Sequence, residues 1–197
     1  MTATFVSYTA SKTLKNALLI FCSLVLLWAT TINAGEKLGG NFSLTTHKNE
    51  PFSLDSIKGK VGLVFFGFTH CPDVCPDTLG RINVLMSNLE DKSQDIQPLF
   101  ITVDPERDTP EVLATYVKYF HPSILGLTGT TEQIDKVIKQ YRSNYSHGEK
   151  NESGAYSVNH SSNLYVIGRD GELAQIIQYG TPQKMMEQRV LTQLEQS

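Results

Sequence analysis

Two cysteines, Cys71 and Cys75, lie four positions apart in this 197-residue chain, and a proline follows each of them. They come directly after the apolar run Val61 to Phe68 and just before a stretch with the helical spacing of apolar residues. A close pair of thiols supports two kinds of chemistry, exchange with other thiols through a disulfide and binding of a soft metal ion. Packing of two inert cysteines requires neither the prolines nor this place after a strand. The pattern therefore favours a reactive or metal-binding pair.

The elements around the cysteines must bring both sulfur atoms within reach of one another. Pro76 has no N–H, so a helix that began at Pro72 would lose a hydrogen bond, and we predict that the helix begins at Pro76 itself. Residues 71–75 then form a loop, which can bring the sulfurs to disulfide distance or let both bind one ion. The positive end of the helix dipole favours the thiolate, the form that either reaction needs.

The rest of the chain predicts one α/β domain. An N-terminal hairpin is followed by strand, helix, strand and helix, then by a second hairpin and a last helix. This order fits a thioredoxin-like α/β sandwich with an N-terminal β-hairpin extension. The predicted strands cover residues 41–45, 51–54, 61–68, 98–103, 156–158, 163–167 and 173–179; helical spacing covers 78–89, 109–120 and 131–141, and a last helix starts at Thr181-Pro182.

The N-terminal segment differs from the rest of the chain in charge and hydropathy. Its only charged side chains are Lys12 and Lys15, and the thirteen residues Ala17 to Ala29 include a single polar side chain. Such a pattern is typical of a secretory signal peptide, while the uncharged stretch 16–35 is almost long enough to span a bilayer. The two lysines would keep the N-terminus on the cytoplasmic side of a membrane.

We therefore expect a signal peptide or single transmembrane anchor at residues 1–34 and an exported domain at 35–197, with membrane contact only through the first segment. The segment lacks arginine, which favours a bacterial export signal and a periplasmic domain anchored to the inner membrane. Cys22 lies in the apolar run and is expected to face lipid, so the exported part keeps two cysteines. In an oxidising compartment such a pair forms a disulfide unless a reductant or a metal intervenes.

Composition excludes several classes of protein. With 40% hydrophobic and 19% charged residues, the chain has the composition of a globular protein rather than a disordered one. The exported part carries 15 Lys and Arg against 20 Asp and Glu, a net charge of −5, so no basic surface is expected to bind nucleic acid. Three cysteines are too few for a disulfide-stapled scaffold or a four-thiolate metal site.

Four segments of the exported part share the motifs of one known family. They are GFTHCPDVCPDTL at 67–79, VDPERDTPEVL at 103–113, YFHPSILGLTGT at 119–130 and YSVNHSSNLYVIGRDG at 156–171. On these motifs the chain resembles the SCO/SenC family of copper-binding proteins that serve the assembly of cytochrome c oxidase. The resemblance implies a thioredoxin-like fold, one membrane anchor or signal, and a periplasmic or intermembrane-space location. It also implies one copper ion bound by Cys71, Cys75 and His160; many members have an aspartate where this chain has Asn159, a neutral amide that can still hydrogen-bond.

The chemistry of these side chains agrees with that ligand set. Two thiolates and an imidazole suit Cu(I), and with a further oxygen donor they also hold Cu(II). By analogy to thioredoxin-like reductases, which place a cis-proline in the turn that faces the cysteines, residues 158–160 stand where that proline would be. This difference favours metal binding over general thiol exchange. A structural zinc would need a fourth ligand, and His70, the obvious candidate, is expected to point away from Cys71.

Other residues with metal-binding or catalytic side chains are expected to have other roles. Asp104 follows a strand, so it serves either the turn and helix cap or, on a surface loop near the copper, a partner protein or the metal. Met185 and Met186 share helical spacing with Val190 and Leu194, which predicts core packing. Three histidines fall in predicted loops and are expected to be solvated: His47, His121 and His147.

Two functional hypotheses follow. The first is a copper metallochaperone that takes one copper ion from an upstream donor and passes it to the dinuclear copper site in the copper-receiving subunit of a haem–copper oxidase. The second is a thiol-disulfide oxidoreductase in which Cys71 and Cys75 act on the cysteines of that oxidase site or of other exported proteins, with a thiol reductant as a further partner. The first makes the protein mainly a carrier rather than an enzyme. A copper or redox sensor is a third, weaker hypothesis.

Overall fold

The computed structural model describes residues 37–152 and 154–196 of the chain. The predicted signal peptide or anchor at 1–34, with Cys22, lies outside these residues. Within the described ranges, no helix is both long enough and apolar enough to cross a membrane.

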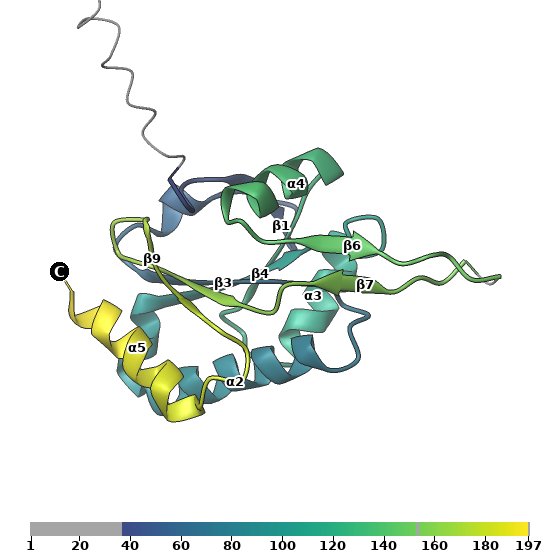
Figure 1. The fold of residues 1–197 in the computed structure, drawn as a ribbon. Coiled ribbons are helices and arrows are strands. Elements are labelled where there is room, and N and C mark those ends of the chain that lie inside the picture. Colours follow the sequence, from purple (N-terminus) through teal and green to yellow (C-terminus); the bar gives the residue numbers. More distant parts are fainter. Residues whose placement is uncertain (1–36, 153, 197) are drawn as a thin grey trace, which may run out of the picture. The chain divides into compact units, whose positions relative to one another are not determined.

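The strand that leads to the cysteines, β3 (Val61–Gly67), lies inside a seven-stranded mixed sheet with the order β2-β1-β5-β4-β3-β8-β9 (Figure 1). It pairs in parallel with β4 (Ile96–Thr102) and antiparallel with β8 (Leu164–Ile167). All seven residues of β3 are buried, as the apolar run predicted, because both faces of the sheet are covered at this place. The cysteines therefore follow a strand that neighbouring strands hold on both sides.

The sheet contains the predicted N-terminal hairpin and a strand that the sequence pattern did not predict. β1 and β2 pair antiparallel, and β1 joins the sheet through β5, which is parallel to β4. The sequence of β5, LGLT, is short and contains Gly126; a Cβ there would lie 3.1 Å from the Cβ of Leu113, so the glycine allows close packing of a helix. The remaining strands are β1 (Ser43–Thr46), β2 (Pro51–Ser53), β5 (Leu125–Thr128), β6 (Tyr145–His147), β7 (Val158–His160) and β9 (Leu173–Ile177).

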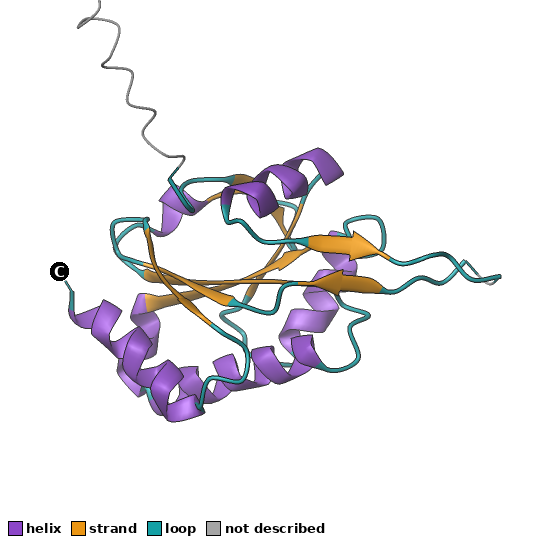
Figure 2. Cartoon of the chain, viewed as in Figure 1, coloured by secondary structure: helices purple, strands orange, loops and turns teal. Residues whose placement is uncertain are grey.

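The helices cover the two faces of the sheet (Figures 1 and 2). α2, α3 and α5 pack on one face against Leu63 and Phe65, and α4 packs with the N-terminal hairpin on the other face against Val64 and Phe66. This is the thioredoxin-like sandwich with an N-terminal hairpin that the element order predicted. The helices are η1 (Leu54–Ile57), α2 (Val74–Asn88), η2 (Glu90–Asp95), α3 (Pro110–Lys118), α4 (Thr131–Gln140) and α5 (Gln183–Glu195).

The start of α2 differs from the prediction. The helix begins at Val74, two residues early, so Cys75 belongs to its first turn. The N–H of Asp77 donates the first intrahelical hydrogen bond to the carbonyl of Asp73, at 3.1 Å. Pro76 is thus the third helical residue, where an N–H has no partner within the helix, and the proline removes no hydrogen bond. The predicted loop is therefore shorter, and only the first cysteine lies in it.

The two predicted threonine caps have different outcomes. Thr109 caps α3 as predicted, since its side chain accepts a hydrogen bond from the N–H of Val112 at 3.4 Å. Thr181 does not cap α5, because that helix begins at Gln183 and its N-cap residue is Pro182. The same Thr-Pro pattern therefore placed one helix start correctly and the other one residue too early.

Candidate metal centre

Cys71, Cys75 and His160 lie together at the end of β3. Their potential ligand atoms, two Sγ and one imidazole nitrogen, all lie within 4.8 Å of one another. The Nε2 atom of His160 is 3.4 Å from the Sγ of Cys75, and both cysteines are free thiols. Among the residues that the structure describes, no other group of three or more histidine, cysteine or acidic side chains has this spacing. The structure thus brings together the three residues that the family resemblance implies as ligands.

The main chain positions the two sulfur atoms. The N–H of Cys71 donates to the carbonyl of Phe68 at 3.2 Å, which turns the chain back after β3, and its side chain is half-buried. Cys75 is fully buried in the first turn of α2. At Gly67 a Cβ atom would lie only 2.7 Å from the Sγ of Cys75 and 2.7 Å from a ring carbon of Phe100. A residue without a side chain at Gly67 is therefore needed to make room for the second sulfur.

His160 approaches the cysteines from a separate pair of strands. It ends β7, and its ring stands edge to face against Phe65 and Phe68, with centroid distances of 6.2 and 5.7 Å. Its Nδ1 lies 3.0 Å from the carbonyl oxygen of Ser161. A carbonyl can only accept, so we assign the ring proton to Nδ1, which leaves the lone pair of Nε2 directed at Cys75. Burial lowers the pKa of His160, which favours the neutral form that binds metals.

Burial has the opposite effect on the second cysteine. It raises the pKa of the Cys75 thiol well above the ordinary value, and the nearby sulfur of Cys71 adds to the shift. The sequence had led us to expect that the helix N-terminus would favour the thiolate. At Cys75 the loss of hydration outweighs the helix dipole, so the metal-free protein keeps the proton, and a metal ion must displace it on binding.

Asp108 supports the cysteine segment, and the sequence analysis did not identify it. Its carboxylate is fully buried and accepts hydrogen bonds from the N–H and hydroxyl of Thr69, at 2.9 and 2.6 Å, and from the hydroxyl of Thr102, at 2.7 Å. The neighbouring His70 has a side chain that is 58% exposed, and it lies outside the cysteine cluster as predicted. The only available signal for Asp108 was its place in the second motif.

The burial of Asp104 rules out one of its two predicted roles, that of a carboxylate on a surface loop near the copper. The residue is completely buried and belongs to no metal-binding group. Its carboxylate accepts hydrogen bonds from the hydroxyl of Tyr156, at 2.7 Å, and from Nε of Arg107, and its N–H donates to the hydroxyl of Thr102. The predicted turn role of Asp104 therefore accounts for its contacts with Thr102 and Arg107, and the contact with Tyr156, 52 residues away, adds a second role.

The remaining candidates lie outside the cluster. Asn159 is exposed, while the residues on either side of it are buried or half-buried, so its amide points away from the side on which His160 lies. Met186 packs in the core as predicted, but Met185 is 44% exposed, because the apolar face of α5 is narrower than the spacing indicated. The other three histidines have structural contacts: His47 Nδ1 accepts from Gly126 N–H, His121 Nδ1 contacts Ser123 Oγ, and the ring of His147 packs against Tyr145 and Tyr156.

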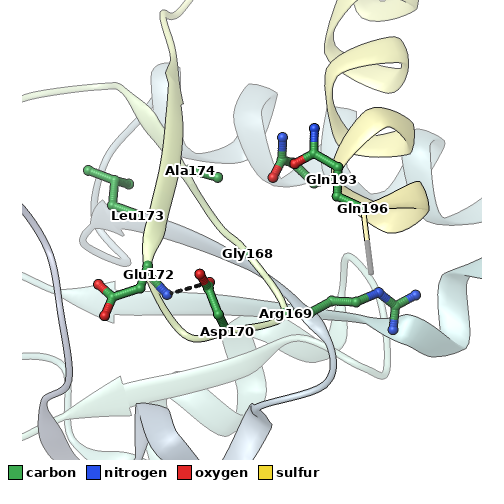
Figure 3. A pocket seen from close by; sticks show the side chains of 8 residues that line it. All are labelled: Gly168, Arg169, Asp170, Glu172, Leu173, Ala174, Gln193 and Gln196. Carbon is green, nitrogen blue, oxygen red and sulfur yellow. Dashed lines mark hydrogen bonds between the residues drawn. The ribbon is translucent and has the colours of Figure 1, made fainter.

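A hollow between the β8–β9 turn and the C-terminal end of α5 is separate from the cluster (Figure 3). Gly62, at the start of β3, pairs with Ile167, just before this turn. The hollow therefore lies near the start of β3, whereas the cysteines follow the end of that strand. The N–H of Glu172 donates to the carboxylate of Asp170 there, at 2.9 Å. No cysteine or histidine lines it.

Comparison with known proteins gives consistent matches. The SCO1/SenC family model matches residues 30–195. The chain is 48% identical over 137 residues to the mitochondrial SCO1 homologue of Homo sapiens, covering 68% of this chain and 46% of that protein. It is 40% identical over 154 residues to an SCO2-like protein of Rickettsia conorii, covering 77% and 75%. The crystal structure of Arabidopsis thaliana ScoI with copper bound matches with a TM-score of 0.75 at 35% identity, covering 81% of this chain and 99% of that one.

The chain spans about half the length of the mitochondrial relatives that it matches. The matched region nevertheless includes nearly all of the described residues. The comparison therefore concerns the domain that carries the cysteine cluster.

Proposed function

Because the chain belongs to the SCO1/SenC family, we propose that it is a copper metallochaperone that binds one copper ion and delivers it to a haem–copper oxidase during assembly. Sco proteins are copper-binding proteins of cytochrome c oxidase assembly, and the plant relative was solved with copper bound. The observation that carries the proposal is the meeting of Cys71, Cys75 and His160, from three separate elements, within 4.8 Å.

The donor set fits the cargo. Two sulfur atoms satisfy Cu(I), which prefers soft ligands, and the neutral imidazole of His160 adds the nitrogen that Cu(II) prefers. Both thiols must lose their protons on binding, so copper uptake by Cys71 and Cys75 releases protons and weakens at low pH. Gly67 makes room for the sulfur of Cys75, and Phe65 and Phe68 pack against the ring of His160, so the three ligand atoms lie close together. None of these neighbours supplies a fourth ligand, as a structural zinc site would require.

Delivery by ligand exchange agrees with the uneven burial of the sulfurs. Cys71 is half-buried, whereas Cys75 is fully buried. In our proposal a thiolate of the copper-receiving subunit binds the ion first, Cys71 then leaves and takes up a proton, and Cys75 leaves last. The copper keeps its oxidation state: the proton lost by the first incoming thiol balances the one that Cys71 gains, and a second thiol of the copper-receiving subunit replaces Cys75 and supplies the proton that Cys75 takes up.

A thiol-disulfide oxidoreductase is the second candidate function. Its support is that the sulfur atoms of Cys71 and Cys75 are free and close. The protein would then form its own disulfide while it reduces a disulfide of its target, and a thiol reductant would have to restore it. Two observations favour copper binding instead: burial raises the pKa of Cys75, so the thiolate of this second cysteine, which would have to close the protein's own disulfide, is scarce, and His160 points its free nitrogen at the same sulfur.

We propose the periplasmic side of a bacterial inner membrane as the location, with residues 1–34 as signal peptide or anchor and 35–197 as the copper-binding domain. The charge pattern of the first segment supports export. An upstream copper donor and a thiol reductant would meet the domain in the same compartment.

Copper titration of the reduced full-length chain in detergent tests the proposal. We expect one copper ion per chain, thiolate-to-copper absorption in the Cu(II) form, and a marked loss of that absorption in His160→Ala. His70→Ala is the matched control, because His70 is adjacent to Cys71 but exposed and outside the cluster, and it should behave as the unaltered protein. A protein that binds no copper tightly, or a His160→Ala variant with unchanged stoichiometry and spectrum, would overturn the proposal.

A further inference from the structure

We propose that Tyr156, held by Asp104 and Arg107, is a positioning residue that keeps His160 against the two cysteines and thereby controls the affinity for Cu(II) more than that for Cu(I). The inference rests on the proposed copper function. It concerns residues that lie outside the ligand set and on a different segment of the chain from the cysteines.

His160 belongs to a pair of strands that is not part of the main sheet, although its ring packs against Phe65 of β3. β6 and β7 form a separate two-stranded sheet, which we call the arm, and Tyr145 stands opposite His160 in its register. Figure 1 shows the arm beside the main sheet, with the loop between its strands extending away from the helices. Backbone hydrogen bonds tie β7 to β6, and the arm is held against the rest of the domain by side-chain contacts and by the short connection 161–163 to β8.

Tyr156, two residues before β7, makes three such contacts. Its hydroxyl donates to Oδ1 of Asp104 at 2.7 Å. Its carbonyl accepts from a terminal nitrogen of Arg107 at 3.1 Å, and its ring lies 3.8 Å from the guanidinium carbon. Arg107 in turn donates through Nε to Oδ2 of Asp104, so both oxygens of this completely buried carboxylate are used. We call Asp104, Arg107 and Tyr156 the clamp.

The clamp also reaches the cysteine side of the site. The guanidinium carbon of Arg107 lies 5.8 Å from the ring centroid of Phe68. The imidazole of His160 is nearly perpendicular to the same ring, with 5.7 Å between the two centroids. Phe68 is also the residue whose carbonyl accepts from the N–H of Cys71. Arm, clamp and cysteine segment are therefore in contact through a single aromatic side chain.

Val158 of β7 is buried in the core and contributes apolar packing, and the other polar attachments of the arm are weaker than the clamp. The hydroxyl of Tyr145 donates to the carboxylate of Asp135 in α4 at 2.7 Å, but this bond is exposed to water and contributes less than the partly buried bond from Tyr156 to Asp104. The N–H of Ser161 donates to the carbonyl of Asn144 at 3.0 Å and closes the base of the arm without joining it to the main sheet. The clamp is a partly buried polar contact between the arm and the loop that follows β4, built around the completely buried carboxylate of Asp104.

The two oxidation states of copper depend differently on this arrangement. Cu(I) is satisfied by soft sulfur ligands, whereas Cu(II) requires nitrogen or oxygen donors in addition. Loosening of the arm moves His160 but leaves Cys71 and Cys75, which β3 and α2 position independently. Loss of the clamp should therefore weaken Cu(II) binding selectively and raise the reduction potential of the bound copper.

The variant Tyr156→Phe tests this in the full-length chain, because it removes the hydroxyl and keeps the ring on Arg107. We expect the Cu(II) dissociation constant to rise about tenfold, as for loss of an outer-shell partner of a metal ligand, while Cu(I) binding changes less than about threefold. Tyr141→Phe is the matched control: it also loses a partly buried hydroxyl, which donates to the carbonyl of Gly40, just before the N-terminal hairpin, at 3.1 Å. This control should leave both affinities unchanged.

A double-mutant cycle and a metal-free measurement separate the clamp from the copper function. In a His160→Ala background, Tyr156→Phe should cause no further loss of Cu(II) affinity, since it acts through that histidine. In the metal-free protein, amide hydrogen exchange of Val158 to Ser161 should be faster in Tyr156→Phe than in Tyr141→Phe.

Equal Cu(II) affinity in Tyr156→Phe and the unaltered protein, or an additional loss in the His160→Ala background, would overturn the inference. Failure of the unaltered protein to bind copper would overturn the proposed function instead. Amide exchange would then still decide whether Tyr156 holds the arm.

Discussion

The cysteine segment and the arm form the two sides of the metal centre, and they are held by different kinds of contact. The cysteine segment continues a strand that is paired on both sides and runs directly into α2. The arm is paired only with itself and meets the domain through side chains. Two completely buried carboxylates from one loop serve the two sides: Asp108 accepts from Thr69 beside the cysteines, and Asp104 accepts from Tyr156 in the arm.

This difference indicates which part of the site can change. Backbone hydrogen bonds and a helix start set the separation of the sulfur atoms, so it varies only if the core deforms. The place of His160 depends on a few side chains, each of which contributes little on its own. A carrier of the kind that we propose would benefit from such a division, because the sulfurs would hold the ion while the imidazole would distinguish its oxidation states.

The largest expected effect comes from removal of a sulfur on the rigid side. Cys75→Ser should weaken Cu(I) binding more than about 100-fold, since loss of an outer partner alone costs 10–100-fold and this change removes a ligand. Competition with a chromophoric Cu(I) chelator measures the effect. His160→Ala, which alters the other side, should weaken Cu(I) binding much less; equal losses in the two variants would show that the two sides contribute alike.

A second test compares the carboxylates as supports of the fold. Asp108→Ala leaves one buried donor of Thr102 and two partly buried donors of Thr69 without their acceptor, and we expect the free energy of unfolding to fall by about 3 kcal/mol. Urea denaturation of the metal-free protein measures it. Asp135→Ala, which removes only the exposed acceptor of Tyr145, should change stability by less than about 1 kcal/mol. A similar change in both variants would contradict the supporting role of Asp108.

The two glycines near the cysteines allow a matched test of packing on the rigid side. Gly67→Ala would place a Cβ 2.7 Å from the Sγ of Cys75, and we expect it to destabilise the fold by about 2 kcal/mol and to weaken copper binding. Gly80→Ala in α2 meets nothing within 4 Å and should stabilise the helix by up to about 1 kcal/mol. Thermal unfolding of the metal-free variants measures both. We expect the two substitutions to change the stability in opposite directions. An unchanged stability in Gly67→Ala would show that the sulfur of Cys75 can shift freely.

The smallest expected effect is a pH dependence on the arm side. Burial and the hydrogen bond to Asp104 raise the pKa of Tyr156 to about 12. Because the pKa in the folded protein is above the unfolded value of about 10, the neutral phenol stabilises the fold below pH 10, and this contribution is lost as the pH rises from 10 to 12. As the pH rises from 9 to 11, the urea concentration at the midpoint of unfolding should therefore fall less steeply in Tyr156→Phe than in the unaltered protein. Identical slopes would mean that the hydroxyl is not held in the folded state.

Several features of the fold were predictable because they depend on neighbouring residues in the chain. The apolar run of β3 identified a strand covered on both faces, and Thr109-Pro110 identified the start of α3. The missed strand β5 has four residues with a glycine, too few to show a period of two, and only its pairing with β4 and β1 makes it a strand. The early start of α2 was missed because the N–H groups of the first helical turn have no partner within the helix, so a proline is tolerated at any of these positions and does not mark the first one.

The sequence by itself determined the pair of thiols after a buried strand, and its motifs pointed to His160, 85 residues beyond Cys75. Only the tertiary structure decided that Cys75 keeps its proton, that Asp104 lies inside rather than on the surface, and that Asp108 holds the cysteine segment. These properties depend on desolvation and on partners 39 to 52 residues away, such as Thr69 and Tyr156. A local pattern carries no information on which distant groups exclude water from a side chain, so the charge state and role of these residues follow from the folded contacts alone.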